Sequence, residues 1–159
     1  MYGLTKGQSS PTTGLAVKND LSPGGNPNLP LNPLALAITM GAPFVARGFA
    51  GDKEHLKALI LEAILFKGTA VVDILQPCVS FNKINTYAWY RERVFKLENP
   101  LTDRYEAIRT ANLWGEKIPI GVIYRNDEAP CREVKEIFRV QLTKADVASR
   151  LNMRCVMMR

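Results

Sequence analysis

A run of β-branched and aliphatic residues at positions 69–75 (Thr-Ala-Val-Val-Asp-Ile-Leu) restricts the fold more than any other feature of the chain. Runs of this kind are typical of strands buried on both faces of a parallel sheet. Gln76-Pro77-Cys78 follows and ends the strand, because proline has no backbone N–H to donate to a neighbouring strand. Parallel strands need a long crossover between them, usually a helix, so the run predicts an α/β protein.

Helical and strand patterns alternate along the rest of the chain. Helices are predicted where apolar residues recur three or four positions apart, and two of them begin at clear caps, Asn32-Pro33 and Gly51-Asp52. We expect helices at residues 34–40, 53–66, 85–95, 103–114 and 132–150, and strands at 43–47, 69–75 and 117–124. This alternation predicts a three-layer α/β arrangement.

The side-chain patterns also indicate where two of these elements lie. In the helix at 53–66, Leu61, Leu65 and Phe66 widen the apolar face, so this helix is predicted to be well buried. Pro119 stands near the start of the strand at 117–124, and proline within a strand favours an edge position.

The first 33 residues contain no segment suited to a regular helix or a central strand. They are rich in Gly, Pro, Ser, Thr and Asn, and so long a loop in a compact domain is usually functional or disordered. Only three strands are evident, which is few for a three-layer fold. We therefore expect a partial parallel sheet that lacks its N-terminal strands, which would lie on upstream sequence.

Charge and residue usage argue against several classes of protein. The net charge is +6, and residues 132–159, with seven basic and three acidic residues, contribute +4 of it. No RNP-like, helix-turn-helix or zinc-finger pattern accompanies this basic end, which favours a solvated surface over nucleic-acid binding. No apolar run is long enough for a transmembrane helix and no signal peptide is evident, so a cytoplasmic protein without membrane contact is expected. The single histidine, His55, is expected on an exposed helix face and excludes an HExxH metal site.

Four stretches, in a fixed order, resemble the beta subunits of 2-oxoacid:ferredoxin oxidoreductases. They are residues 2–12, 41–49, 73–82 and 85–87, and the region 114–121 also fits. Four ordered motifs are far more specific than a single glycine-rich loop. The resemblance implies that the chain is the C-terminal half of such a subunit, with a partial three-layer sheet of the thiamine-diphosphate-binding fold.

The resemblance also implies a domain organisation. Residues 1–128 would form the C-terminal part of the thiamine-diphosphate-binding domain. Residues 129–159 match none of the family's motifs and are expected to form a basic, largely helical tail of unknown role.

The segment at residues 2–12 resembles the part of these subunits that closes the thiamine-diphosphate site. By this resemblance Tyr2, Gly3, Leu4 and Thr5 would bind the cofactor, with Leu4 near the reactive thiazolium. Lys6 would pair with the substrate carboxylate, because a nearby cation offsets that charge in a dry pocket. Judged on its residues alone, the segment has an alternative reading as a flexible tail with turn glycines.

Magnesium is implied with the cofactor, because diphosphate carries dense negative charge and Mg²⁺ prefers oxygen ligands. Met1 stands about where the family has a backbone carbonyl donor, and the other protein ligands would lie upstream. We therefore expect this chain by itself to bind thiamine diphosphate weakly or not at all.

Cys78 matches the cysteine that family members use as the fourth thiolate of a [4Fe–4S] cluster. A cubane needs four thiolates, and the other three would lie on upstream sequence. In this chain by itself Cys78 is expected to be a free thiol near the surface. Its residues alone favour a small buried hydrophobe, which is the commoner role of a free cysteine. Cys131 and Cys155 match nothing in the pattern and are expected to be plain thiols.

The activity implied by the resemblance is oxidative decarboxylation of a 2-oxoacid, pyruvate or a similar acid, to an acyl-CoA and CO₂. Electrons would pass through iron–sulfur clusters to ferredoxin, and the implied partners are an alpha subunit, gamma or delta subunits, ferredoxin, the 2-oxoacid and coenzyme A. Two alternatives remain open. One is a different thiamine-dependent enzyme, and the other is a non-catalytic α/β interaction module.

Overall fold

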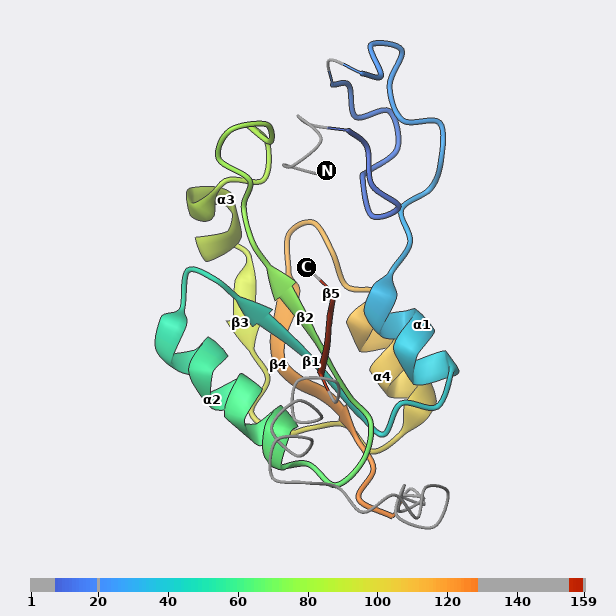
Figure 1. Cartoon of the computed structure of the whole chain (residues 1–159), viewed down its shortest axis with the longest axis vertical. Coiled ribbons are helices and arrows are strands. Elements are labelled where there is room, and N and C mark those ends of the chain that lie inside the picture. The colour runs from blue at the N-terminus through green and yellow to red at the C-terminus, as the bar shows by residue number, and fades with distance from the viewer. Residues whose placement is uncertain (1–7, 20, 129–154, 159) are drawn as a thin grey trace, which may run out of the picture.

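The computed structural model describes residues 8–19 and 21–128 in full and, beyond them, the backbone of residues 155–158 (Figure 1). Its helices are α1 (Pro33–Thr39), α2 (Lys53–Leu65), α3 (Tyr87–Arg91) and α4 (Arg104–Ala111). Its strands are β1 (Phe44–Phe49), β2 (Ala70–Leu75), β3 (Val94–Lys96), β4 (Ile118–Arg125) and β5 (Cys155–Met158). The helix predicted at 132–150 lies outside the described residues.

The strands form one mixed sheet in the order β3-β4-β1-β2-β5. β1 and β2 are parallel, as predicted, with Phe44 opposite Ala70 and Phe49 opposite Leu75. β5 is parallel to β2, and β3 is parallel to β4. The expectation of a wholly parallel sheet is wrong at one place, because β4 runs antiparallel to β1.

The path of the chain after β2 explains this reversal. A loop and the short helix α3 follow β2, and both stay at the carboxyl end of β1 and β2 (Figure 1). β3 therefore starts at that end and runs back in the opposite direction. The helix α4 then returns the chain, and β4 runs parallel to β3. One loop in place of a crossover helix thus converts a parallel sheet into a mixed one.

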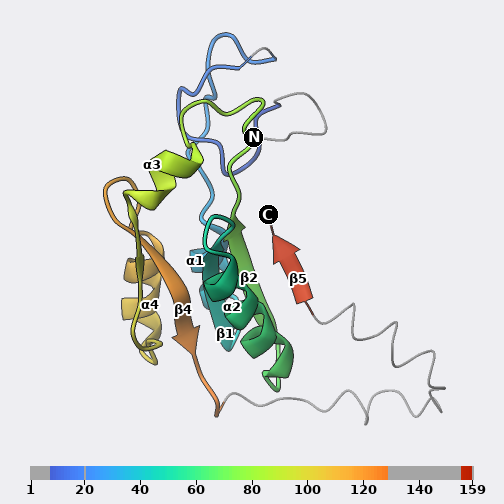
Figure 2. The same cartoon turned by 90° about the vertical axis from the view of Figure 1, so that its left-hand side faces the viewer.

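Helices cover both faces of the sheet, which confirms the three-layer α/β fold. α1 and α4 lie on one face, and Leu34 and Ile38 of α1 pack with Val45 of β1 and Ile123 of β4. α2 lies on the other face, where Leu59 packs against strand residues of β1, β2 and β4 (Figures 1 and 2). Every residue of β1 is buried, so β1 is the centre of the core.

Both predicted helix caps are present. The Asn32 side-chain oxygen accepts hydrogen bonds from the backbone N–H groups of Leu34 (3.0 Å) and Ala35 (3.2 Å), with Pro33 at the first helical position. The Asp52 carboxylate accepts from the N–H of His55 at 3.2 Å. Each cap provides an acceptor for N–H groups that have no partner inside the helix.

The prediction that α2 is well buried is wrong. Within it only Leu59 and Ala63 are buried, while Leu61, Ile64 and Leu65 are 55%, 53% and 71% exposed. One face of the helix contacts the sheet, and no described element covers the other face. The sequence pattern showed that α2 is apolar on more than one side, but not that only one side of the helix would be covered.

The edge position predicted for the strand with Pro119 is also wrong, because β4 lies between β3 and β1. The N–H of Ile118 and the carbonyl of Ile120 both bond towards β3, so the nitrogen of Pro119 faces the β1 side. On that side pairing with β1 extends only as far as Gly121 opposite Arg47. Pro119 can lie inside the sheet because no carbonyl of β1 needs a hydrogen bond from its backbone nitrogen.

The helix predicted at 85–95 is shorter than expected. α3 ends at Arg91, and Val94 begins the three-residue strand β3, which pairs with Ile118 of β4. The carbonyl of Arg93 accepts a hydrogen bond of 2.8 Å from the N–H of Ile118. A strand of three residues is stabilised mainly by pairing with β4, so the local sequence contains little information from which to predict it.

Candidate functional site

Three loops gather at the carboxyl end of β1 and β2 (Figures 1 and 2). They are the loop that contains residues 8–31, the connection from β1 to α2, and the loop between β2 and α3 that carries Cys78. Open α/β sheets place their binding and catalytic loops at this end of the strands. The described end of the first motif, residues 8–12, and the loop with Cys78 therefore lie at the same end of the sheet.

The loop that carries Cys78, residues 76–86, is organised by Asn82. Its side-chain oxygen accepts hydrogen bonds from the N–H groups of Ile84 and Asn85, each 3.0 Å long. Its backbone N–H donates to the carbonyl of Cys78 at 2.9 Å, closing a turn. Sequence analysis had included Asn82 in a matching stretch without giving it a role.

Cys78 is a half-buried free thiol, which confirms the expected position near the surface and excludes the fully buried alternative. The preceding Pro77 is buried, whereas Val79, Phe81 and Ile84 are 63%, 37% and 60% exposed. An apolar surface of this kind around a thiol suits a partner that excludes water. Within the described residues, no group of three or more His, Cys, Asp or Glu side chains could hold a metal ion.

The loop from residue 8 to residue 31 is held together by Asn26, whose side chain is buried. Its amide donates to the carbonyls of Thr13 (2.7 Å), Asn28 (3.1 Å) and Gly14 (3.2 Å). Backbone bonds between Ala16 and Asn26 (2.8 Å) and between Asn26 and Val17 (3.0 Å) cross the same loop. Hydrogen bonds therefore tie residues 8–19 to residues 21–31, whereas residues 2–7, for which a tail was the alternative reading, lie outside the described residues.

The residues proposed to contact the cofactor lie outside the described residues. These are Met1, Tyr2, Gly3, Leu4, Thr5 and Lys6. Ser10, which follows them in the same motif, is buried, and its N–H donates to the hydroxyl of Thr13 at 2.8 Å. The roles of residues 1–6 remain predictions.

A buried ion pair links the two central strands. Arg47 of β1 is 2% exposed, and its Nε lies 3.2 Å from Oδ2 of Asp73, the residue opposite it on β2. Its Nη2 donates to the carbonyl of Ala111 at the end of α4 at 3.3 Å, while its buried Nη1 has no hydrogen-bond partner. Burial lowers the pKa of Arg47, and the carboxylate of Asp73 opposes that shift. Sequence analysis missed this pair, although a charge inside each of two apolar strands was a visible signal.

Aromatic side chains surround this pair. The guanidinium of Arg47 lies 5.7 Å from the ring centre of Trp114, and Tyr90 of α3 contacts the same indole edge-on at 6.3 Å. Tyr90 also packs against Phe49 at 5.6 Å. Burial, and secondly the charge of Asp73, raise the pKa of Tyr90 to about 12, so its phenol is neutral at physiological pH. Tyr90 of α3 therefore belongs to the core, and the half-buried Tyr87 and Trp89 pack against it.

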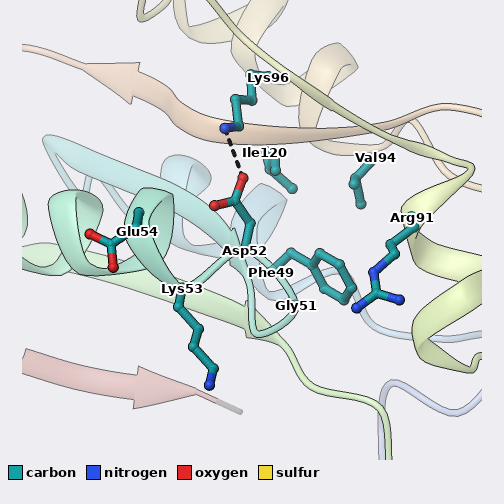
Figure 3. A pocket seen from close by; sticks show the side chains of 9 residues that line it. All are labelled: Phe49, Gly51, Asp52, Lys53, Glu54, Arg91, Val94, Lys96 and Ile120. Carbon is teal, nitrogen blue, oxygen red and sulfur yellow. Dashed lines mark ion pairs between the residues drawn. The ribbon is translucent and has the colours of Figure 1, made fainter.

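An open pocket of about 650 Å³ lies beside the start of α2 (Figure 3). Asp52 and Lys96 meet in it at 2.7 Å, and Arg91 extends from α3 towards the ring of Phe49. Its lining contains three basic and two acidic side chains, so its charges nearly balance. The pocket alone therefore indicates no class of ligand. His55, just beyond it, is half-buried, not exposed as predicted.

Known proteins match this chain along most of its length. The family described as the C-terminal part of the pyruvate ferredoxin oxidoreductase beta subunit matches residues 78–137. This chain is 45% identical to the 2-oxoacid:ferredoxin oxidoreductase beta subunit of a Sulfolobus species, over 84% of its own length. It is also 45% identical to the beta subunit of Saccharolobus solfataricus, over 80% of its length. The chain belongs to the 2-oxoacid:ferredoxin oxidoreductase beta-subunit family.

A solved member of the family has the same fold. The 2-oxoglutarate:ferredoxin oxidoreductase from Magnetococcus marinus, with 2-oxoglutarate, coenzyme A and succinyl-CoA bound, superimposes with a TM-score of 0.77 at 34% identity. The match covers 94% of this chain and 54% of that one. The chain likewise spans about half the length of the curated relatives, 48% and 46% of the two named above.

The family match begins at Cys78 and continues to residue 137, so the resemblance extends past residue 128, the predicted end of the domain. Among the described residues, none of the helices combines the length and the hydrophobicity needed to cross a bilayer.

Proposed function

We propose that this chain forms part of a 2-oxoacid:ferredoxin oxidoreductase, in which Cys78 is one thiolate ligand of a [4Fe–4S] cluster. The observation that carries the proposal is the position of Cys78. Its thiol is free and half-buried, on a loop fixed at the carboxyl end of the sheet, at the first residue of the family match. The reaction would convert a 2-oxoacid to an acyl-CoA and CO₂, with electrons passing to ferredoxin.

The environment of Cys78 fits a shared cluster. A cubane takes four thiolates, so three must come from elsewhere in the complete enzyme. Exposed Val79 and Phe81 beside the thiol would be covered by that other part and would then exclude water. Solvent access is one of the main determinants of a cluster's reduction potential, so these side chains would help to set it.

The thiamine-diphosphate site is proposed for residues 2–5, with Lys6 facing the substrate carboxylate and the carbonyl of Met1 contributing to Mg²⁺. This is supported by the loop that follows, which Asn26 holds in a defined conformation at the carboxyl end of the sheet. When bound, thiamine diphosphate supplies the carbanion chemistry of decarboxylation, and the protein orients it and excludes water.

The substrate is proposed to be a 2-oxoacid such as pyruvate. The family description names pyruvate, two relatives are named for 2-oxoacids in general, and the solved relative contains 2-oxoglutarate. Their names share the 2-oxoacid group, which Lys6 would recognise through its carboxylate. The difference between these acids lies in the remainder of the side chain, which would be bound elsewhere.

The remaining proposals concern the assembly. An alpha subunit, further gamma or delta subunits and ferredoxin would be partners, because a relative is named as a beta subunit of a 2-oxoacid:ferredoxin oxidoreductase. Coenzyme A would be a further partner, because it is bound in the solved relative. A cytoplasmic location is proposed with them. Residues 1–128 would belong to the thiamine-diphosphate-binding domain, and residues 129–159, of which the family match includes those up to 137, would be a basic tail.

A composite enzyme tests the function. This chain would replace the matching part of the Saccharolobus solfataricus beta subunit, which would be produced together with the remaining subunits of that enzyme. Reduction of ferredoxin would be followed with pyruvate and with 2-oxoglutarate, each with and without coenzyme A. We expect 2-oxoacid-dependent reduction that requires coenzyme A, with pyruvate as a substrate. A composite that assembles and binds thiamine diphosphate yet reduces no ferredoxin would instead support the non-catalytic module.

A further inference from the structure

The loop that carries Cys78 is tied at both ends to residues around the buried Arg47. On the near side, β2 leads into the loop, and Asp73 of β2 pairs with Arg47 at 3.2 Å. On the far side, the loop leads into α3, where Tyr90 packs with Phe49 and Leu75, two residues beyond Arg47 and Asp73 on their strands. The entry and the exit of the loop therefore meet over the same part of the sheet.

Arg47 reaches a third segment at this end of the molecule. Its Nη2 donates to the carbonyl of Ala111, the last residue of α4, and its guanidinium lies against Trp114 in the loop that follows. Asn32, the cap of α1, donates to the same Ala111 carbonyl at 2.8 Å. Arg47 thus contacts β2 and the end of α4, which in turn holds the start of α1.

A fully buried charge for a purely structural purpose would be unusual. Desolvating an ion pair is costly, and apolar residues of similar volume stabilise a core equally well or better in many proteins. Arg47 also keeps Nη1 buried without a hydrogen-bond partner, which adds to that cost. The planar guanidinium does supply what apolar side chains cannot, namely directional bonds to two segments at once.

We propose that Arg47 is the positioning residue of the Cys78 loop. It fixes the end of β2 through Asp73 and the end of α4 through Ala111, so that the thiol of Cys78 projects from one defined place. This inference rests on the proposed function in one respect only, namely that the thiol placed by Arg47 is a cluster ligand. The order of the loop itself can be measured whether or not a cluster binds there.

The test compares variants in the composite enzyme by hydrogen exchange of the amides at residues 76–86, with and without the cluster. Arg47→Met should raise the exchange rate of the amides in this loop by about tenfold or more, because the bonds from Arg47 to Asp73 and Ala111 are lost. Arg47→Lys keeps the positive charge but not the planar guanidinium that bonds to two segments at once, so it should raise the exchange rate less. Arg125→Met is the matched control and should leave the loop unchanged, since Arg125 ends β4 opposite Phe44 and pairs with Glu62 of α2 and with Asp127.

A second variant separates positioning from general stability. Arg47→Met combined with Asp73→Leu removes both charges, so its melting temperature should remain near that of the parent. It should still show faster loop exchange and an altered electron paramagnetic resonance spectrum of the reduced cluster. Loop exchange within twofold of the parent in both the single and the double variant would overturn the proposal. If loop exchange rises while a Cys78→Ala variant keeps its cluster, the positioning role stands and the proposed function fails.

Discussion

Asn26 offers the sharpest test of how the loop from residue 8 to residue 31 is built. Its side chain has two N–H hydrogens and bonds to three carbonyls, of which that of Thr13 is the shortest at 2.7 Å. Its oxygen also accepts from the N–H of Asn28 at 3.3 Å. Asn26→Ala removes all of these bonds and leaves buried carbonyls without a donor.

The expected magnitude follows from the bonds that are lost. The loss of the buried hydrogen bond to Thr13 removes about 1 kcal/mol, and the carbonyl that is then left without a partner costs about a further 1–3 kcal/mol. The loop should therefore lose about 2–4 kcal/mol of local stability. Because about 1.4 kcal/mol corresponds to a factor of ten, the open form should become about 30- to 1000-fold more populated. The sheet makes none of these bonds and should melt as before.

Limited trypsin cleavage after Lys18, an exposed residue of the same loop, measures this population. Cleavage follows the open fraction when reclosing is faster than proteolysis. Asn28→Ala is the matched control, since Asn28 is exposed and its contacts with Asn26 use only its backbone. A cleavage rate for Asn26→Ala within threefold of the parent would refute the view that this side chain holds the loop.

Three further predictions follow from individual residues. Gly25 has φ +92°, and a Cβ there would lie 2.9 Å from the carbonyl oxygen of Ala16, so Gly25→Ala should speed the same trypsin cleavage at least about tenfold, and an unchanged rate would contradict the geometry. A hydrogen bond from Lys96, followed by one from the N–H of His55, lowers the pKa of Asp52, so the stabilisation it gives is present above pH ~4 and is lost as the pH falls through the lowered value. Thermal melts should show that the advantage of the parent over Asp52→Asn shrinks as the pH falls below about 4, and a constant difference would be the wrong result. Burial, then Lys96, lowers the pKa of His55, so the unfolded chain binds the proton more readily; stability should fall as the pH drops below about 6.5, less so in His55→Gln, and equal slopes would argue against it.

Local signals in the sequence sufficed for much of the fold. Asn32-Pro33 and Asp52 located the starts of α1 and α2, and the β-branched run located β2. These features act within a few residues, through caps and backbone preferences, so they can be read without knowing the partners. The ordered motifs likewise led to the family, which the relatives confirm.

Features that depend on distant contacts were not predictable in the same way. β3 exists because the carbonyl of Arg93 meets the N–H of Ile118, and β4 could hold Pro119 inside the sheet because β1 pairs no further than Gly121. The exposed face of α2 shows the same limitation. Asn26 was hidden in a stretch of turn residues, and its role appears only when Thr13 and Asn28 are brought beside it.

The site was predicted in part. Cys78 was identified from the resemblance, and its half-buried position is seen in the structure, while its role as a cluster ligand stays a prediction. The charges of Arg47 and Asp73 were visible within two apolar strands, and their pairing became evident only with the register of β1 and β2.

The role of Cys78 is the central claim, and the content and spectrum of its cluster test it most directly. Composite enzymes with Cys78→Ala and, as the control, Cys131→Ala would be reconstituted with iron and sulfide. Iron content, visible absorbance and the electron paramagnetic resonance spectrum of the reduced state would then be compared. We expect Cys78→Ala to lose the [4Fe–4S] signal and 2-oxoacid-dependent ferredoxin reduction, with the fold intact, and Cys131→Ala to keep both. Full retention of the cluster and of ferredoxin reduction in Cys78→Ala would contradict the account.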